Sequence, residues 1–398
     1  MTIIATITLI CSQLIFYFFI DYYLIIISYF LFGVAGSLAY FQTLKNCWKY
    51  FPGKEGLISG IIFSAFGLSS FTFTSLGDLI INKDHVDPES DGFYRKEIAL
   101  KFLDYVKLFL ICVVVMGTLS SILCFTYEEQ KKGENDPKKI LEEEENVHNE
   151  GDTEDKVDLV KKEEKEEKEL NVFETKLTLR ESILSVEFSK CLSVAGCTLI
   201  FGFLLTNTYR NFGIERKLDE LGMQTLSKAY TMLNTFSRIA WGFIFDKFGF
   251  KKPYIFVCIN QLICGLVIYH SSKNLIIYFI VVCFGVLSFS GHVILFPNLI
   301  KIKFGVENSV IILGICGVFS GIASLMGPVL SLFILKKEED YLMIYLIGVS
   351  PVIISLILTF FIKVKYIKDK KDMKDTITDT PDDKRLTEKT VSFENTEE

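Results

Sequence analysis

Long runs of apolar residues alternate with short polar segments through most of this 398-residue chain. A helix needs roughly 20 residues to cross a hydrocarbon core about 30 Å thick, so each run predicts one membrane-spanning helix. The first run lacks the basic start and the small-residue cleavage site of a signal peptide, and we interpret it as a span. The predicted fold class is an all-α polytopic membrane protein with about ten spans, which cover residues 2–20, 23–45, 56–77, 103–126, 186–206, 225–245, 254–270, 274–299, 309–335 and 341–363.

Two charged segments interrupt the apolar pattern and divide the chain. Residues 1–126 form an N-terminal helical half with four spans, and residues 186–363 form a C-terminal helical half with six. Between them lies a linker, 127–185, whose charged part has almost no aromatic residues, and a polar tail follows at 364–398. Such a linker cannot bury a core, so we expect a solvated, mostly disordered segment with transient helix. A role in binding a partner is the alternative.

Composition narrows the classes of function. Half of the residues are hydrophobic, and the net charge of −6 comes largely from the polar segments, so it gives no reason to expect a nucleic-acid partner. The ten cysteines are scattered without C-x-x-C pairs and resemble small buried apolar residues more than a disulfide framework or metal site. No nucleotide-binding loop, metal cluster or catalytic triad is visible, so neither an enzyme nor a cofactor is expected.

The basic residues predict the orientation in the membrane. Lysines cluster on every second loop, as the positive-inside rule requires of cytoplasmic loops: Lys45, Lys49 and Lys54, then Lys247, Lys251 and Lys252, then Lys301 and Lys303, and finally a group after the last span. Both termini and the linker are therefore expected to be cytoplasmic. The sequence does not identify which membrane is crossed.

A weak internal repeat relates the two halves. Gly53–Glu55 and Gly305–Glu307 each precede a span with the pattern Gly-x-Glu, at an offset of roughly 252–254 residues. Two glycines recur inside those spans at the same seven-residue spacing, as Gly60 and Gly67 and as Gly314 and Gly321. Parallel repeated halves joined by a loop are typical of secondary transporters. Spans five and six have no partner in the first half, so we expect a six-plus-six parent that has lost its first two helices, through a truncated gene model or a real deletion.

One arginine, Arg238, lies inside an apolar run, eight residues before the polar boundary at Asp246. Eight helical residues place it about 12 Å deep, near the membrane centre, where a charge is expensive and marks a candidate functional site. No Asp or Glu lies well inside a span, and a guanidinium fork suits a carboxylate. The alternatives are a structural ion pair, a bond to a backbone carbonyl, or snorkelling to the interface.

The loop after Arg238 contains a motif that favours a gate. Asp246 at a helix end can pair across an interface or bind a neighbouring helix N-terminus, which would latch one conformation of an alternating-access carrier. The alternative is a plain boundary that follows the positive-inside rule. The residues of the candidate gate are Gly242, Asp246, Lys247, Gly249, Lys251 and Lys252.

This loop resembles the G-x-x-x-D-R/K-x-G-R-R/K signature of the major facilitator superfamily. Lys49–Pro52 followed by Gly56, Gly60, Phe66 and Gly67, together with SRIAWG at 237–242 and GIASLMGP at 321–328, resembles its oxalate:formate antiporter and monocarboxylate transporter branch. The resemblance covers nearly all ten spans. It implies a fold of twelve helices and a secondary transporter of a small monocarboxylate, such as pyruvate, lactate or formate, with a proton or counter-anion as the coupled solute.

The resemblance also assigns roles to single residues. Arg238 stands where these carriers place a substrate-binding arginine. Asn234 replaces the aspartate of proton-coupled carriers and cannot carry a proton, and Ser320 replaces a lysine of oxalate carriers, which favours a monoanion. His292 could relay protons or pack as a hydrogen-bonded core residue. Further candidates to line the cavity are Tyr40, Gln42, Asn46, Asn207, Tyr209 and Asn298.

Two rival interpretations remain open. The first is a carrier of another organic anion or a drug-like solute on the same fold, because fold does not determine substrate. Unchanged transport in Arg238→Lys would favour it. The second is a membrane protein that transports nothing, and two further spans encoded upstream would argue against it.

Overall fold

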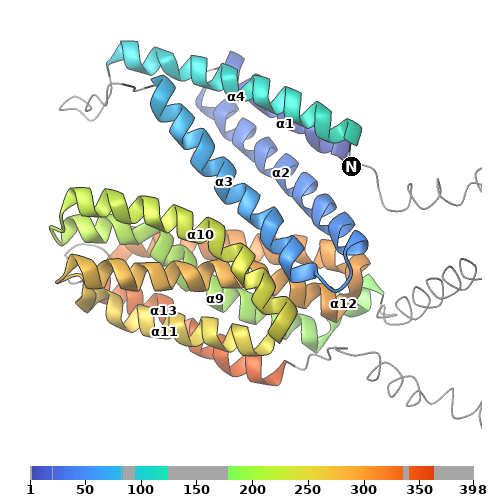
Figure 1. Ribbon diagram of the computed structural model, residues 1–398, viewed down its shortest axis with the longest axis vertical. Coiled ribbons are helices and arrows are strands. Elements are labelled where there is room, and N and C mark those ends of the chain that lie inside the picture. Colours follow the sequence, from blue (N-terminus) through green and yellow to red (C-terminus); the bar gives the residue numbers. More distant parts are fainter. Residues whose placement is uncertain are drawn as a thin grey trace, which may run out of the picture. The chain divides into compact units, whose positions relative to one another are not determined.

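A computed structural model describes residues 2–19, 21–81, 83, 95–123, 178–334 and 340–362. All regular elements in these ranges are α-helices (Figure 1). They are α1 (Thr2–Phe18), α2 (Tyr22–Tyr50), α3 (Glu55–Ile81), α4 (Lys96–Leu123), α8 (Leu179–Leu184), α9 (Val186–Glu215), α10 (Glu220–Phe248), α11 (Lys251–Ser271), α12 (Leu275–Ile334) and α13 (Asp340–Phe361). Most of the predicted linker and all of the predicted tail lie outside the described residues.

The predicted fold class is confirmed. Each predicted span coincides with a helix, and α12 contains two of them, 274–299 and 309–335, separated by a break at Gly305. By length and composition, seven of the described helices can cross a membrane, α12 being counted once. The shorter α1 and the more polar α10 fall outside that set.

Glycines with positive φ mark the turns between helices. Gly53 (φ 80°) precedes α3, and Gly305 (φ 75°) precedes the second part of α12, at equivalent places in the internal repeat. Gly249 (φ 71°) separates α10 from α11. Glycine adopts this left-handed backbone region at little cost, whereas a residue with a Cβ is strained there. The repeat therefore extends from the sequence to the backbone.

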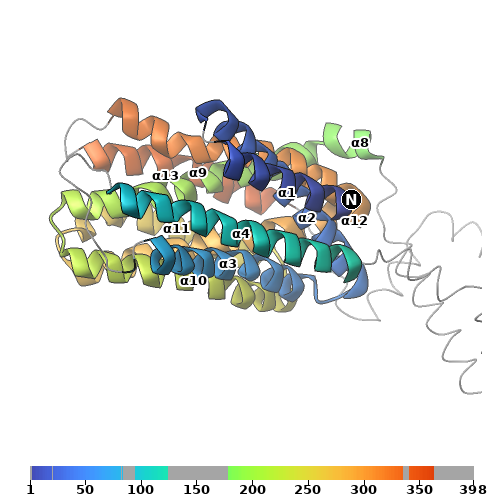
Figure 2. The ribbon, with the colours of Figure 1, turned by 90° about the horizontal axis from the view of Figure 1, so that it is seen from above.

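We call α1–α4 the N-terminal half and α9–α13 the C-terminal half. In the C-terminal half, α9 packs against both α12 and α13, and α11 packs against the same two helices. Figure 2 shows these long helices running side by side. Large aromatic side chains fill the space between them, including Phe201, Phe212, Tyr254, Tyr278 and Tyr345, which are fully buried.

The most extensive contact between the halves joins α3 to α10. A Cβ added at Gly60 would lie 2.6 Å from the carbonyl oxygen of Arg238, and one added at Gly56 would lie 2.5 Å from that of Gly242. One turn beyond Gly60 along α3, the Ser64 hydroxyl donates to the Thr235 carbonyl at 2.7 Å. Small residues thus let the two backbones touch, as is common in packed membrane helices. This contact positions both candidate sites described below.

Candidate functional site

The first candidate site surrounds Arg238 of α10, where this helix contacts α3. Its Nη1 donates to the carbonyl oxygen of Phe63 at 2.5 Å, and its Nη2 donates to Oδ1 of Asn234 at 3.3 Å. Its Nε is buried and has no hydrogen-bond partner in the described part of the chain. Among the ion pairs between described residues, none involves Arg238. A cation is therefore held inside the protein with its Nε–H unused.

Two tyrosines adjoin the guanidinium. Tyr40 of α2 and Tyr230 of α10 both lie close enough to Arg238 for their charges to influence each other. The Tyr230 hydroxyl bonds to Thr206 at 2.7 Å, and its ring stacks on Tyr209 at 4.8 Å. The Tyr40 hydroxyl, in contrast, is buried without a partner among the described residues.

The wall of this site is aromatic on the side of the N-terminal half. The Tyr40 ring lies 4.9 Å from the ring of Phe63 and 5.5 Å from that of Phe66. Apolar rings lower the local dielectric, which strengthens electrostatic attraction between Arg238 and an anion. An unpaired buried polar group costs about 1–3 kcal/mol, and a ligand that accepts from Arg238 Nε and Tyr40 removes that cost. The arrangement can bind an anion.

The other predicted cavity residues have different surroundings. Asn207 donates to the Ser324 carbonyl at 3.5 Å, and Ser320 donates to the Cys316 carbonyl of its own helix at 3.0 Å. Gln42 donates to Asn46, also within one helix, at 3.4 Å.

His292 lies inside the C-terminal half. Only 3% of its surface is exposed, its Nδ1 shares a 2.7 Å hydrogen bond with the Tyr254 hydroxyl, and its ring stacks on Phe296. Tyr254 continues to Thr198 at 3.0 Å, and Thr198 bonds to Ser355 at 2.7 Å. This network connects α9, α11, α12 and α13. The described contacts of His292 thus join helices of one half to each other.

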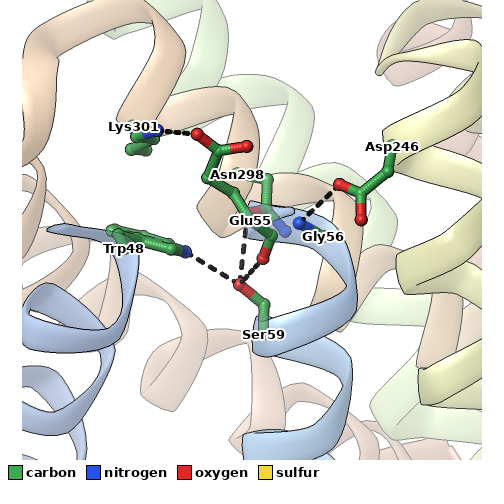
Figure 3. A network of polar contacts seen from close by, with 7 residues as sticks. All are labelled: Trp48, Glu55, Gly56, Ser59, Asp246, Asn298 and Lys301. Atoms are coloured by element: carbon green, nitrogen blue, oxygen red, sulfur yellow. Dashed lines mark hydrogen bonds and ion pairs between the residues drawn. The ribbon is translucent and has the colours of Figure 1, made fainter. Parts of the chain in front are cut away.

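The second candidate site lies where α10 ends and α3 begins. The Asp246 carboxylate accepts from the backbone N–H of Gly56 at 2.7 Å and from that of Leu57 at 2.9 Å (Figure 3). These N–H groups belong to the first turn of α3, where no intrahelical carbonyl is available to them. The first intrahelical bond is made by the next residue, Ile58, to Lys54. Asp246 therefore caps a helix of the other half, and its charge suits the positive end of the helix dipole.

Ion pairs surround this cap on both sides. Glu55 of α3 pairs with Lys301 of α12 (Figure 3). Glu307, which follows the break in α12, pairs with Lys45 and Lys49 of α2, the latter at 2.5 Å. Glu55 and Glu307 are 252 positions apart, and so are Lys49 and Lys301. The two pairs are therefore the same contact made reciprocally by the two repeats.

A buried polar chain completes this region. The Trp48 indole donates to Ser59 Oγ at 2.9 Å, and Ser59 Oγ lies 3.1 Å from Asn298 Oδ1, which places α2, α3 and α12 in one network (Figure 3). Trp48 is 1% exposed and Asn298 is fully buried. We call the whole set the inter-half lock; it comprises Lys45, Trp48, Lys49, Glu55, Ser59, Asp246, Asn298, Lys301 and Glu307. Sequence reasoning assigned Asn298 to the cavity, whereas its contacts here are in the lock.

The remaining residues of the predicted gate have different surroundings. Gly242 touches the backbone of Gly56, so a side chain there would force the helices apart. Lys247 lies over the Phe248 ring, and Lys251 donates to the Phe360 carbonyl at 2.7 Å. Lys252 is exposed.

The ion pairs of the lock were not predicted from the sequence. Their lysines were used only to predict which loops are cytoplasmic. The repeated Gly-x-Glu pattern was the available clue, because it places a glutamate at the same point of each half. Among the described residues, no group of three or more His, Cys, Asp or Glu side chains gathers as a metal site.

Comparison with known proteins agrees with this architecture. A family model described as Major Facilitator Superfamily matches residues 1–328. The structure is similar to that of a variant of the E. coli fucose:proton symporter FucP, with a TM-score of 0.56 and 11% sequence identity. The alignment covers 90% of this chain and 82% of that one. At this identity the likeness shows a shared fold. No curated protein sequence matches the chain.

Proposed function

The chain belongs to the major facilitator superfamily, and on that premise we propose that it moves a small monocarboxylate, of the pyruvate, lactate or formate type, across a membrane by alternating access. The observation that carries the proposal is the pair of unused polar groups at the centre of the fold, Arg238 Nε and the Tyr40 hydroxyl. In this proposal they bind the substrate carboxylate, and Asn234 orients the guanidinium through its bond to Nη2.

Charge balance favours a monoanion. Arg238 is the cation of the site, its described polar partners are neutral, and Ser320 is neutral where oxalate carriers have a lysine. A dianion would bring one uncompensated negative charge into a site of low dielectric, which costs several kcal/mol. Asn234 cannot exchange a proton, so exchange against a counter-anion fits this site better than proton coupling through that position.

The inter-half lock supports the alternating-access part of the proposal. Alternating access requires contacts that close one end of the pathway in one conformation and break in the other. The lock joins α2 and α3 to α10 and α12, at the end of the helices where the basic loops gather. We propose that this end is cytoplasmic and that the structure represents the conformation closed to the cytoplasm.

A second candidate substrate is an organic anion with an apolar body. The aromatic wall formed by Tyr40, Phe63 and Phe66 favours it, because a pocket of rings also binds larger hydrophobic groups. Competition of aromatic carboxylates with pyruvate uptake distinguishes the two candidates.

We also propose that two more membrane helices accompany the described ones in the working transporter. Gly60 and Gly67 of α3 pack tightly on α10, whereas a Cβ at the repeat-related Gly314 or Gly321 meets no described atom within 4 Å. This difference supports the expected six-plus-six parent, in which a helix equivalent to α10 covers the second pair of glycines. Cross-linking of cysteines placed at Gly314 to an added upstream helix pair tests it.

The experiment for the substrate is uptake of labelled pyruvate and lactate into proteoliposomes. Arg238→Ala removes hydrogen bonds from a charged donor, each worth about 1.5–3 kcal/mol, so apparent affinity should fall roughly 10- to 100-fold. Tyr40→Phe removes one neutral hydrogen bond, worth about 1 kcal/mol, and should lower apparent affinity about fivefold. Arg210→Ala, which removes an exposed arginine of α9, is the control and should change nothing.

Two results would contradict the proposal. Uptake by Arg238→Ala equal to that of the unaltered protein would remove Arg238 from the substrate site. Absence of uptake of either acid by a folded protein, with and without added upstream helices, would refute the monocarboxylate assignment and leave the fold standing.

A further inference from the structure

The short segment around Gly305 makes contacts in two directions. Lys301 and Glu307 reach α3 and α2 and belong to the inter-half lock. Residues between and beside them reach instead to the start of the C-terminal half, where Lys303 pairs with Glu187 at 2.6 Å and the Phe304 ring contacts the Phe188 ring. Residues 301–308, which we call the hinge, therefore contact the N-terminal half through the lock. They also contact the start of the C-terminal half, in a set of contacts that we call the support.

The support begins with α8, a helix of six residues that ends one residue before α9. Thr178 and Glu181 form a capping box: the Glu181 N–H donates to Thr178 Oγ1 at 3.3 Å, and the Thr178 N–H donates to Glu181 Oε2 at 2.8 Å. Reciprocal capping of this kind fixes a helix start. The helix is thus defined by its own sequence.

One face of α8 is turned inward. Ser182 is fully buried, Leu179 and Ile183 are partly buried, and Leu184 is 75% exposed. Positions three and four residues apart share one face of a helix, so these inward residues form one stripe. This stripe packs on α9 and α12. There, Asn308 Nδ2 lies 3.5 Å from Ser182 Oγ, directly after the lock residue Glu307.

The junction to α9 is also braced. Ser185 caps α9 by accepting from the Phe188 N–H at 3.1 Å, and its hydroxyl donates to the Ser182 carbonyl at 2.7 Å. Glu187 then pairs with both Lys190 and Lys303. The contacts from Ser182 to Lys303 form one connected network, and Lys303 lies only two residues before Gly305.

We propose that α8 is a clamp that sets the strength of the inter-half lock by holding the hinge 301–308 in the orientation that presents Lys301 and Glu307 to the other half. The inference rests on the gating role of the lock in the proposed function, and goes beyond it by placing control of the gate in the segment that follows the charged linker. A shift of α8 turns the hinge at Gly305, where the backbone is not helical. The lock pairs then lose their geometry together.

The two tryptophans of the chain provide the measurement. Trp48 lies in the lock and is 1% exposed, so Trp241→Phe leaves a fluorophore that reports lock opening. Acrylamide quenching of Trp48 is measured in purified protein in nanodiscs. Glu307→Gln tests the lock itself and should raise the quenching constant about fivefold, which is the scale expected for partly exposed ion pairs. Ser182→Leu, which overpacks the buried stripe, should give a similar rise, and Leu184→Ser on the exposed face should give none.

The double variant Ser182→Leu with Glu307→Gln decides between coupling and independent damage. If α8 acts through the lock, the combined effect is less than multiplicative, because Glu307→Gln has already removed part of what α8 controls. A multiplicative effect, or no effect of Ser182→Leu where Glu307→Gln acts, overturns the proposal. No response to Glu307→Gln refutes the gating role and the clamp with it. If Ser182→Leu does not fold, the milder Ser182→Ala is used in the same cycle, and the same outcomes apply.

Discussion

Replacing Asp246 by Asn tests the trans-acting helix cap with almost no change of shape. The carboxylate accepts from both Gly56 and Leu57, at 2.7 and 2.9 Å, whereas an amide has one acceptor oxygen and turns an NH₂ group toward the second N–H. Losing a hydrogen bond to a charged acceptor costs about 1.5–3 kcal/mol, and losing the charge at a helix N-terminus costs about 0.3–1 kcal/mol. Asp246 is partly exposed, so we estimate that Asp246→Asn destabilises the closed state by about 2 kcal/mol. This corresponds to a roughly 30-fold increase in the equilibrium constant for opening.

Hydrogen exchange measures that change at the amides concerned. Gly56 and Leu57 depend on Asp246 for protection, so their exchange rate should rise roughly 30-fold in Asp246→Asn, in proportion to the open population. Ile58, which bonds to Lys54 within α3, is the internal control and should change far less. Asp219→Asn, which alters the cap at the opposite end of α10, is the matched control. Unchanged exchange at Gly56 and Leu57 would refute the capping role.

Three further predictions concern the lock, the helix contact and the buried histidine. Lys301→Glu should increase the open population about tenfold, because the introduced carboxylate would repel Glu55. The charge-exchanged variant, Glu55→Lys with Lys301→Glu, should recover most of the closed state, measured by Trp48 quenching. No recovery would mean that the two residues do not stabilise the lock as an ion pair. Gly60→Ala should lower the midpoint temperature of thermal unfolding, because its Cβ would lie 2.6 Å from a carbonyl oxygen. Gly314→Ala should leave that temperature unchanged, because its Cβ meets no described atom within 4 Å. A large decrease for Gly314→Ala would show that another helix covers this glycine. His292→Gln should lower the free energy of unfolding by about 1 kcal/mol, because the hydrogen bond to Tyr254 is lost. The pH profile of uptake should stay unchanged. A shifted pH profile would support the proton-relay hypothesis instead.

The helices were predictable from the sequence because bilayer thickness fixes their length and loops must contain the polar residues. The break at Gly305 was marked by the Gly-x-Glu pattern it shares with Gly53. The roles of the polar residues on those helices were harder to predict, because a sequence does not show which way each side chain faces. Asn298 illustrates this: it lies on a predicted span, but it bonds to Ser59 in the lock.

The sequence suggested that Asp246 binds a neighbouring helix N-terminus, as it does at Gly56 and Leu57, but the ion pairs between distant parts of the chain were not predictable. Glu307 and Lys45 are separated by 262 positions, and only the packed halves bring them together. The helix α8 was missed for another reason, since it lies at the end of a charged segment expected to lack structure. Its Thr178-x-x-Glu181 capping box was the overlooked signal. The substrate roles of Arg238, Asn234 and the other cavity residues stay predictions until transport is measured.

If Arg238 binds substrate as proposed, its bond to the Phe63 carbonyl couples substrate binding to gating. This bond ties α10 to α3, so Arg238, the proposed substrate ligand, also makes a contact between the halves. In the proposed transporter, a carboxylate bound at Nε neutralises the guanidinium and so weakens its charge-assisted bond to the Phe63 carbonyl. Part of the binding free energy of the carboxylate then offsets the cost of separating the halves. Because thermodynamic linkage is reciprocal, the state with separated halves binds the carboxylate more tightly. On this proposal, the empty protein is held closed by the same group that recognises the substrate, so opening without substrate is suppressed and no separate sensor is needed.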